Sequence, residues 1–390
     1  MPDRRADVAR RRRNLLLAAG AAFVLGVVVG GASGDGGDDP QRREGVRGAS
    51  VPSASAPVEP APVDRLTLRQ QVGQLIVMRF AGTTAPGYVR AALRDRRAAG
   101  VILFRDNVAG PEQLRALTAA LRRAAAGDRP IVAVDQEGGD IRIVPWAPPD
   151  APAREQAAAG TARADAEAAA SALRSAGITV GLAPVGDVPS VDGAALGGRA
   201  FSDDPEEAGR AIAAAVEGWR AGGVAATAKH FPGLGGATVN TDDAPASIER
   251  SRAQLDATDL PPFEAAIDAG VPLVMIGHAR YPALDPNRIA SQSEAIVGGL
   301  LRTELGFRGV VVTDSLEAEA SLATGTITTA AERAVRAGAD LVLLTGAGSY
   351  RPVYRHLLAV ARRSPPFRER MRESAARVLA LKQGGAAAPR

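Results

Sequence analysis

Eight short apolar runs, each preceded by a helical stretch and followed by a polar residue, restrict the fold of this 390-residue chain more than any other feature. The runs are rich in β-branched residues and apolar at consecutive positions, so both faces of each strand must be buried. Segments with helical composition and apolar spacing separate them, among them 111–126, 153–176 and 205–221. The runs span residues 73–80, 101–104, 131–134, 179–185, 224–228, 271–276, 310–313 and 341–344. Strands of this kind, alternating with helices, predict a parallel sheet.

Eight such units fit a single-domain α/β fold, a (β/α)8 barrel of the TIM type. An open, doubly wound sheet is the alternative, but no Gly-rich dinucleotide motif and no phosphate-binding Lys loop follows the first run. A glycine precedes several runs, and we expect it to end the preceding helix or to form a tight turn. These glycines are Gly100, Gly223, Gly270 and Gly309.

The N-terminal part of the chain differs in composition from the rest. Residues 1–13 carry six Arg and two Asp, and the uncharged, apolar run 14–34 follows them. As a helix, these 21 residues would span roughly 30 Å, the thickness of a bilayer's hydrocarbon. We expect a basic cytoplasmic tail and then a transmembrane anchor or a cleaved signal peptide, which places the remaining chain outside the cytoplasm, anchored or secreted. Residues 35–64, rich in Gly, Pro, Ser and Ala, predict a linker, and the barrel is expected over 65–385.

Composition also excludes several classes of site. The chain has no Cys, which excludes disulfides, thiolate nucleophiles and Cys-ligated zinc. It has three histidines, His230, His278 and His356, and His356 lies in an unrelated helical stretch, so we expect no metal and no cofactor. The net charge of +4 equals that of residues 1–13, and the remaining chain is neutral. A nucleic-acid partner is therefore not expected.

Polar residues follow five of the runs, at positions that meet at one opening of a (β/α)8 barrel. They are Asp135, Gln136 and Glu137 after the third run, Asp187 after the fourth, Lys229 and His230 after the fifth, His278 after the sixth and Asp314 after the seventh. Charged and hydrogen-bonding groups without a metal-ligand set favour a neutral, polyhydroxylated ligand. Cleavage of a sugar acetal needs a carboxylate beside an oxocarbenium-like centre. The pattern therefore predicts a carbohydrate site.

Each of these residues also has a structural interpretation. Asp314 followed by Glu317 fits a helix N-cap with an acidic third position. Lys229 fits a buried ion pair, His278 a hydrogen-bonded core histidine, and Asp187 a residue that ties down its own loop. Position supports a functional site for the set as a whole and not for any single member.

Five motifs, in chain order, resemble glycoside hydrolase family 3 in its β-N-acetylglucosaminidase subgroup, over residues 65–385. They are 134–139 (Val-Asp-Gln-Glu-Gly-Gly), 183–188 (Ala-Pro-Val-Gly-Asp-Val), 198–202 (Gly-Arg-Ala-Phe-Ser), 229–233 (Lys-His-Phe-Pro-Gly) and 312–316 (Val-Thr-Asp-Ser-Leu). The resemblance implies a retaining exo-glycosidase that removes terminal β-N-acetylglucosamine from cell-wall glycan fragments and needs no cofactor. We expect a carbohydrate substrate, a membrane contact through the N-terminal segment only, and a monomer.

The resemblance also implies roles for individual residues. Asp314 matches the nucleophile that forms the glycosyl-enzyme intermediate. Four positions match those that hold the hydroxyls of the terminal sugar, and two more are implied to line the same mouth. The four are Asp135, Arg199, Lys229 and His230, and the two are Asp187 and His278.

One loop departs from the subgroup. After the fifth strand the subgroup has an Asp-Ser-His element, whose His is oriented by the Asp and acts as general acid/base, and this chain has Asn-Thr-Asp at 240–242. Leu234 and Gly236 stand where the subgroup usually has His and Asp, and Asp140 where it usually has Arg. A free Asp, with a pKa near about 3.9, is mostly ionised at neutral pH and needs burial to donate a proton.

Two hypotheses follow from this departure. In the first, an active glycosidase uses Asp242 or Asp243 of this loop as the carboxylic acid. In the second, the barrel is a catalytically impaired protein that binds glycan without turnover.

Overall fold

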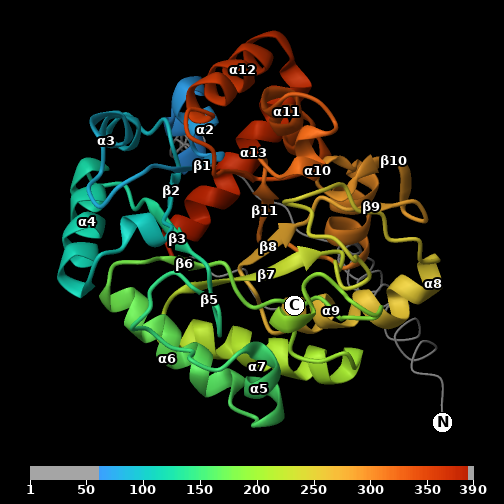
Figure 1. Cartoon of the computed structure of the whole chain (residues 1–390). Helices are drawn as coiled ribbons and strands as arrows, with labels where there is room; N and C mark the ends of the chain where they lie inside the picture. Colours follow the sequence, from blue (N-terminus) through green and yellow to red (C-terminus); the bar gives the residue numbers. More distant parts are fainter. Residues whose placement is uncertain (1–60, 385–390) are drawn as a thin grey trace, which may run out of the picture. The chain divides into compact units, whose positions relative to one another are not determined.

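Eight parallel strands close into a barrel in the computed structural model of the chain, which describes residues 61–384 (Figure 1). The barrel strands are β1 (Ile76–Arg79), β2 (Gly100–Ile102), β3 (Ile131–Val134), β6 (Val180–Gly181), β7 (Ala225–Phe231), β8 (Leu273–Ile276), β11 (Val310–Ser315) and β12 (Leu341–Leu344). They follow one another around the ring in chain order, and β12 pairs with β1. The predicted barrel is confirmed, and the open sheet is wrong because the last strand closes on the first.

Helices surround the ring of strands (Figure 1). They are α2 (Leu68–Gly73), α3 (Gly87–Arg94), α4 (Pro111–Ala124), α5 (Ala153–Ala158), α6 (Ala162–Ser175), α7 (Pro205–Gly222), α8 (Arg252–Gln254), α9 (Pro261–Asp268), α10 (Glu319–Leu322), α11 (Ile327–Ala337), α12 (Tyr350–Arg363) and α13 (Pro365–Lys382). The predicted helix 153–176 is two helices, because a turn with Gly160 at φ 69° separates α5 from α6.

Short elements complete the described chain. The 3-10 helices are η1 (Pro62–Arg65), η2 (Arg105–Asn107), η3 (Gly197–Arg199) and η5 (Ala290–Gln292), and the π-helical segments are η4 (Leu255–Asp259) and η6 (Ala295–Glu304). Two antiparallel pairs extend from the barrel loops: β4 (Gln136–Gly138) with β5 (Ile141–Arg142), and β9 (Arg280–Tyr281) with β10 (Asp285–Ile289).

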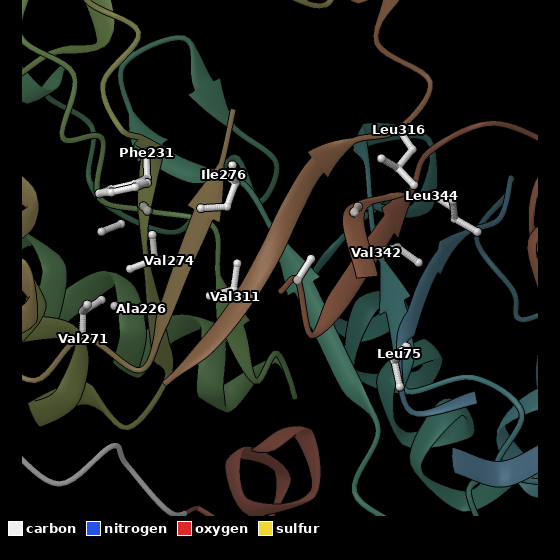
Figure 2. Packing of buried hydrophobic residues seen from close by; sticks show 14 of the residues in the cluster. Leu75, Ala226, Phe231, Val271, Val274, Ile276, Val311, Leu316, Val342 and Leu344 are labelled. Atoms are coloured by element: carbon white, nitrogen blue, oxygen red, sulfur yellow. The ribbon is translucent and has the colours of Figure 1, made fainter. Parts of the chain in front are cut away.

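The apolar runs bury both faces because the barrel has two hydrophobic layers. Along β8, Leu273 and Met275 belong to one buried cluster, whereas Val274 and Ile276 belong to another. Successive side chains of a strand point to opposite faces, so the first cluster fills the barrel and the second lies between strands and helices. Figure 2 shows part of the outer cluster. Consecutive apolar positions are therefore a requirement of the barrel.

Helix α13 packs against one end of the barrel interior. Val378 belongs to the inner cluster and Leu381 packs against it. The helix ends at Lys382, among residues that begin β3, β6 and β7. This end, at the N-terminal ends of the strands, is called the base below. The opposite end is open to the functional site.

The four glycines before strands serve two different purposes. Gly223 and Gly270 have φ values of 81° and 80° and follow α7 and α9, as predicted. The prediction is wrong for Gly100 and Gly309, which lie at close approaches of the backbone. A Cβ on Gly100 would lie 2.0 Å from the Ile131 carbonyl oxygen, and one on Gly309 would lie 2.4 Å from that of Pro272.

The folded part begins slightly earlier than predicted. Residues 62–64, assigned to the linker, form most of η1, with Val63 buried. Asp64 accepts hydrogen bonds from Arg372 of α13 at 2.7 Å, which ties this segment to the barrel. The predicted basic tail 1–13, apolar segment 14–34 and most of the linker lie outside the described residues. Over 61–384, no helix has both the length and the apolar character that crossing a membrane requires.

Candidate active site

A cavity of about 520 Å³ opens at the carboxyl ends of the barrel strands. Its floor is the uppermost layer of the barrel interior, formed by Ile102, Leu182, Met275 and Leu343. Its polar wall combines residues from six different strand–helix loops or strand ends: Arg79, Asp135, Arg199, Lys229, His230, Asn240, Asp242, Asp314, Ser315, Glu317 and Thr345. A cavity of this size, apolar below and polar around, is typical of a small-molecule site.

Lys229 lies at the centre of an ionic network on this wall. Its ammonium lies 2.6 Å from Asp135 Oδ1 and 2.6 Å from Glu137 Oε1, and its side chain is 2 % exposed. Arg199, carried by η3, donates two hydrogen bonds to Glu137, at 2.8 Å from Nε and 2.6 Å from Nη2. The network holds Asp135, Lys229 and Arg199 in fixed positions at the cavity surface.

Glu137 is the buried anion that holds this network together. Burial alone would raise its pKa, but Lys229 and Arg199 together lower the pKa from 4.5 to about 2. The carboxylates of Asp135 and Glu137 raise the pKa of Lys229, although burial and the charge of Arg199 act in the opposite direction. Glu137 and Lys229 are therefore both charged at neutral pH. The carboxylates of Glu137 and Asp135 compensate the positive charges of Lys229 and Arg199.

We expect Glu137 to make folding pH-dependent. A carboxyl whose pKa is lower in the folded state stabilises the fold above its unfolded pKa, and this contribution is lost as pH falls from about 4.5 towards 2. The shift corresponds to ~3 kcal/mol. Glu137→Gln should lower the free energy of unfolding at pH 7 and flatten its dependence between pH 4.5 and 2, measured by denaturant unfolding. Glu155→Gln, at an exposed position of α5, is the control. An unchanged pH dependence in Glu137→Gln would contradict this assignment.

His230 is oriented by a carboxylate behind it. Its Nδ1 lies 2.7 Å from Asp187 Oδ2, and the other oxygen of Asp187 accepts hydrogen bonds from the backbone N–H groups of His230 and Leu234, at 3.2 and 2.7 Å. The buried Asp187 thus fixes both the ring and the loop that follows β7. His230 Nε2 remains free to face the cavity, 3.9 Å from Asp314 Oδ2.

Asp314 lies near the end of β11 with its carboxylate at the cavity wall. Burial would raise its pKa, but His230, His278 and the backbone N–H of Ser315 lower it below the ordinary range. The Ser315 N–H donates to Asp314 Oδ1 at 2.7 Å. The alternative that Asp314 caps a helix is wrong, because the next helix, α10, has Ala318 at its N-cap.

The loop after β7 brings a second carboxylate to the same cavity. Asp242 lines it together with Asn240, whereas Asp243 does not. The backbone of this loop is held against α10, because the carbonyl oxygens of Thr241 and Asp242 accept hydrogen bonds from the first turn of that helix, both at 3.1 Å. Of the two candidate acids, Asp242 therefore lines the cavity and Asp243 does not.

Asp242 and Asp314 have pKa values that their surroundings push in opposite directions. Desolvation by the surrounding wall raises the pKa of Asp242, and the negative charge of Asp314 raises it further. The pKa of Asp314 is lowered by neighbouring histidines that outweigh its burial. Two carboxyl groups in one cavity, one favouring the protonated form and one the ionised form, have the properties of an acid and a nucleophile.

Two predicted site residues do not line the cavity. Asp187 is buried behind His230 and ties down its loop, as its structural interpretation predicted. His278 is also fully buried: its Nε2 donates to the Ser315 carbonyl oxygen at 2.8 Å, and its Nδ1 contacts Ser291 Oγ at 2.8 Å. The implied placement of Asp187 and His278 at the mouth is therefore wrong. Each is buried behind a residue that lines the cavity, Asp187 behind His230 and His278 behind Ser315.

Two acidic residues of the site were not assigned from the sequence. Glu137 follows the third run, but its pairing with Arg199 joins positions 62 residues apart, so no local pattern indicates its role. Glu317 lines the cavity, and its Oε2 accepts a hydrogen bond from the Thr345 N–H at 2.9 Å. The spacing from Asp314 to Glu317 had suggested a helix cap, whereas both side chains face the cavity.

The third histidine lies apart from this cavity. His356 belongs to α12, and its Nε2 contacts Glu332 of α11 at 2.7 Å. Within the described range, no three His, Asp or Glu side chains are arranged to hold a metal ion.

Comparisons with known proteins agree on one family. The model described as the glycosyl hydrolase family 3 N terminal domain matches residues 67–381. A beta-hexosaminidase of Xanthomonas oryzae is 37 % identical over 281 residues, which are 69 % of this chain and 83 % of the relative. A beta-hexosaminidase of Stenotrophomonas maltophilia gives the same identity and coverage.

Solved structures give the same result. A family 3 beta-N-acetylglucosaminidase from a Paenibacillus species superposes with a TM-score of 0.77 and 36 % identity, over 82 % of this chain and 62 % of that one. This chain therefore spans less than two thirds of the Paenibacillus structure. A beta-N-acetylhexosaminidase from Beutenbergia cavernae has a TM-score of 0.76 and 34 % identity, over 82 % of this chain and 99 % of its own.

Proposed function

Because the chain belongs to glycosyl hydrolase family 3 and is a glycoside hydrolase, we propose that it is a retaining exo-glycosidase in which Asp314 is the nucleophile and Asp242 the general acid/base. The preferred substrate is a terminal β-N-acetylglucosamine on a cell-wall glycan fragment. We place this reaction outside the cytoplasm, because residues 1–34 have the composition of an N-terminal anchor or signal peptide. The names of the similar proteins, beta-hexosaminidase and beta-N-acetylglucosaminidase, support the sugar class.

One observation carries the proposal: two carboxyl groups line one cavity and have oppositely shifted pKa values. Retaining glycosidases use one carboxylate as nucleophile and a second, protonated carboxyl as acid. The subgroup's acid/base histidine is absent, and Asp242 occupies its place in the aligned loop. A raised pKa increases the fraction of Asp242 that carries the proton an acid must give.

The reaction follows from these protonation states. The ionised Asp314 attacks the anomeric carbon, while Asp242 gives its proton to the glycosidic oxygen, so that the C–O bond breaks and the aglycone leaves as an alcohol. The ionised Asp242 then takes a proton from water, which attacks the anomeric carbon and releases Asp314. Asp242 regains its proton in this second step, and the enzyme returns to its starting state.

The ionic network around Lys229 holds the terminal sugar in this scheme. The groups that line the cavity are the carboxylate of Asp135, the guanidinium of Arg199, the ammonium of Lys229 and the Nε2 atom of His230. Their positions are fixed before substrate arrives, by Glu137 and by Asp187. Pre-organised partners for hydroxyl groups lower the entropy that binding costs.

We expect the full chain to hydrolyse a chromogenic β-N-acetylglucosaminide, and a natural N-acetylglucosaminyl disaccharide, with release of the β-anomer of the sugar. The measurement is product formation by absorbance, with the anomer identified by NMR before mutarotation. The corresponding β-glucoside serves as the substrate control. Binding of N-acetylglucosamine without turnover of either substrate would contradict the proposal and support a glycan-binding protein. Release of the α-anomer would contradict the retaining mechanism.

A further inference from the structure

A second cavity lies at the base of the barrel, at the end away from the candidate active site. It has a volume of about 290 Å³ and is lined by the first residues of β3 and β6 and by the end of α13. Four basic residues, Arg122, Arg129, Arg174 and Lys382, belong to its lining, and no acidic residue does. We call it the base cavity. Its charge is unexpected in a barrel domain whose acidic and basic residues balance.

Three of these cations have no carboxylate partner among the described residues. Arg122, Arg129 and Arg174 are exposed, and none forms a salt bridge within the part of the chain that the structure describes. Lys382 is 2 % exposed and paired with Asp128, at 2.5 Å, and it also donates to Gln74 at 2.9 Å. Asp128 neutralises Lys382, so the positive charge of the lining comes from the three arginines.

Helix ends place two of these arginines at the base, because helix C-termini favour basic residues. Arg122 and Arg174 are in the last turns of α4 and α6. On other helices a last-turn arginine is paired in some cases, as Arg336 of α11 is with Glu332 at 2.8 Å, and has no salt bridge among the described residues in others, as for Arg220 of α7. What distinguishes the base cavity is that four cations line one space without an acidic residue in the lining.

Two glycines of the lining pack against these arginines. A Cβ on Gly177 would lie 2.4 Å from Thr118 Oγ1 and 3.1 Å from Arg122 Nη2, and one on Gly223 would lie 3.2 Å from Arg174 Nη1. Both glycines line the base cavity and have positive φ values, 83° and 81°. The guanidinium groups of Arg122 and Arg174 therefore lie beside glycines of the cavity wall.

We propose that the base cavity binds a phosphate group. Several arginine forks facing one small space match the oxygens and charge of phosphate, and each can donate two parallel hydrogen bonds. The phosphate belongs either to a soluble phosphate compound or to the headgroup of a phospholipid, which share this chemistry. Binding at the base leaves the opening at the other end of the barrel free, so the site acts independently of hydrolysis.

Calorimetric titration of the full chain in phosphate-free buffer tests this. The probes are inorganic phosphate, for the soluble source, and glycerophosphoglycerol, a phospholipid headgroup without its acyl chains. We expect saturable binding of at least one probe, which weakens at high salt. The double variant Arg122→Gln/Arg174→Gln should weaken it at least tenfold. The matched control Arg115→Gln changes an exposed arginine on the same helix, α4, outside the cavity and should leave the affinity unchanged.

The outcomes are distinguishable. Tighter binding of inorganic phosphate indicates the soluble source, and tighter binding of the phosphodiester indicates the headgroup. Absence of binding by both probes at about 10 mM, or an affinity that the double variant does not change, overturns the proposal. Glycosidase activity and the unfolding midpoint of the double variant should equal those of the parent, which shows that a loss of binding does not come from misfolding.

Discussion

Asp314→Asn is expected to abolish hydrolysis, with a fall in kcat of at least about four orders of magnitude for a chromogenic N-acetylglucosaminide. The amide cannot form the glycosyl ester, and the substitution hardly changes the volume of the side chain. The carboxylate lies at the end of β11, 3.9 Å from His230 Nε2. Steady-state kinetics measure the loss, and titration with N-acetylglucosamine tests whether sugar binding remains.

A covalent adduct gives this prediction a second readout. An activated 2-fluoro glycoside reacts with the nucleophile and then hydrolyses slowly, so intact-protein mass spectrometry should detect one added sugar in the parent and none in Asp314→Asn. Peptide mapping should place the sugar on residue 314. Glu317 lines the same cavity three residues away, and Glu317→Gln is the control that retains the adduct. An adduct on any other residue would reject Asp314 as the nucleophile.

Asp242→Asn should produce the second-largest loss, and its size should depend on the leaving group. With a natural disaccharide, we expect kcat to fall by about 10²–10⁴, because the departing alcohol needs a proton. A dinitrophenyl glycoside leaves without protonation, so its first step should change little and the glycosyl-enzyme should accumulate. Azide, a nucleophile that needs no general base, should then restore turnover. Asp243→Asn, in the same loop but outside the cavity, is the matched control.

The pH profile should separate the two carboxyl groups. Asp314 must be ionised, and because its pKa is lowered, activity should fall only below the ordinary Asp range. Asp242 must be protonated in the first step, and because its pKa is raised, activity should fall as pH rises through a value above that range. This alkaline limb should appear with the natural disaccharide and be absent with the dinitrophenyl glycoside, whose leaving group needs no proton. An alkaline limb that survives unchanged with the dinitrophenyl glycoside, or equal losses in Asp242→Asn with both leaving groups, would show that another residue is the acid.

Local pattern was sufficient for the barrel because burial on both faces leaves a signal at every strand. The runs 131–134 and 341–344 coincide with β3 and β12 to the residue. The role expected for Gly100 is wrong because local pattern shows only that a glycine comes before a strand. It does not show that the Ile131 carbonyl of the next strand blocks a side chain there.

The roles of polar residues depended on contacts between distant segments. Asp187, His230 and His278 all follow strands, and the sequence places all three at the same opening of the barrel. Tertiary packing places His230 in the cavity wall, and it buries Asp187 behind His230 and His278 behind Ser315. The choice between Asp242 and Asp243 was likewise open, because neighbouring residues of a loop differ only in the direction that the folded backbone gives them.

The amino-acid sequence by itself determined the ring of parallel strands, the end of the ring that carries polar groups, and the family, since periodic burial and short motifs are properties of contiguous residues. Only the tertiary structure decided which carboxyl groups share a cavity, how Asp135 and Glu137 together neutralise Lys229 and Arg199, and which arginines meet at the base. Charges act through space, and their pKa values and partners are set by neighbours that lie far apart along the chain.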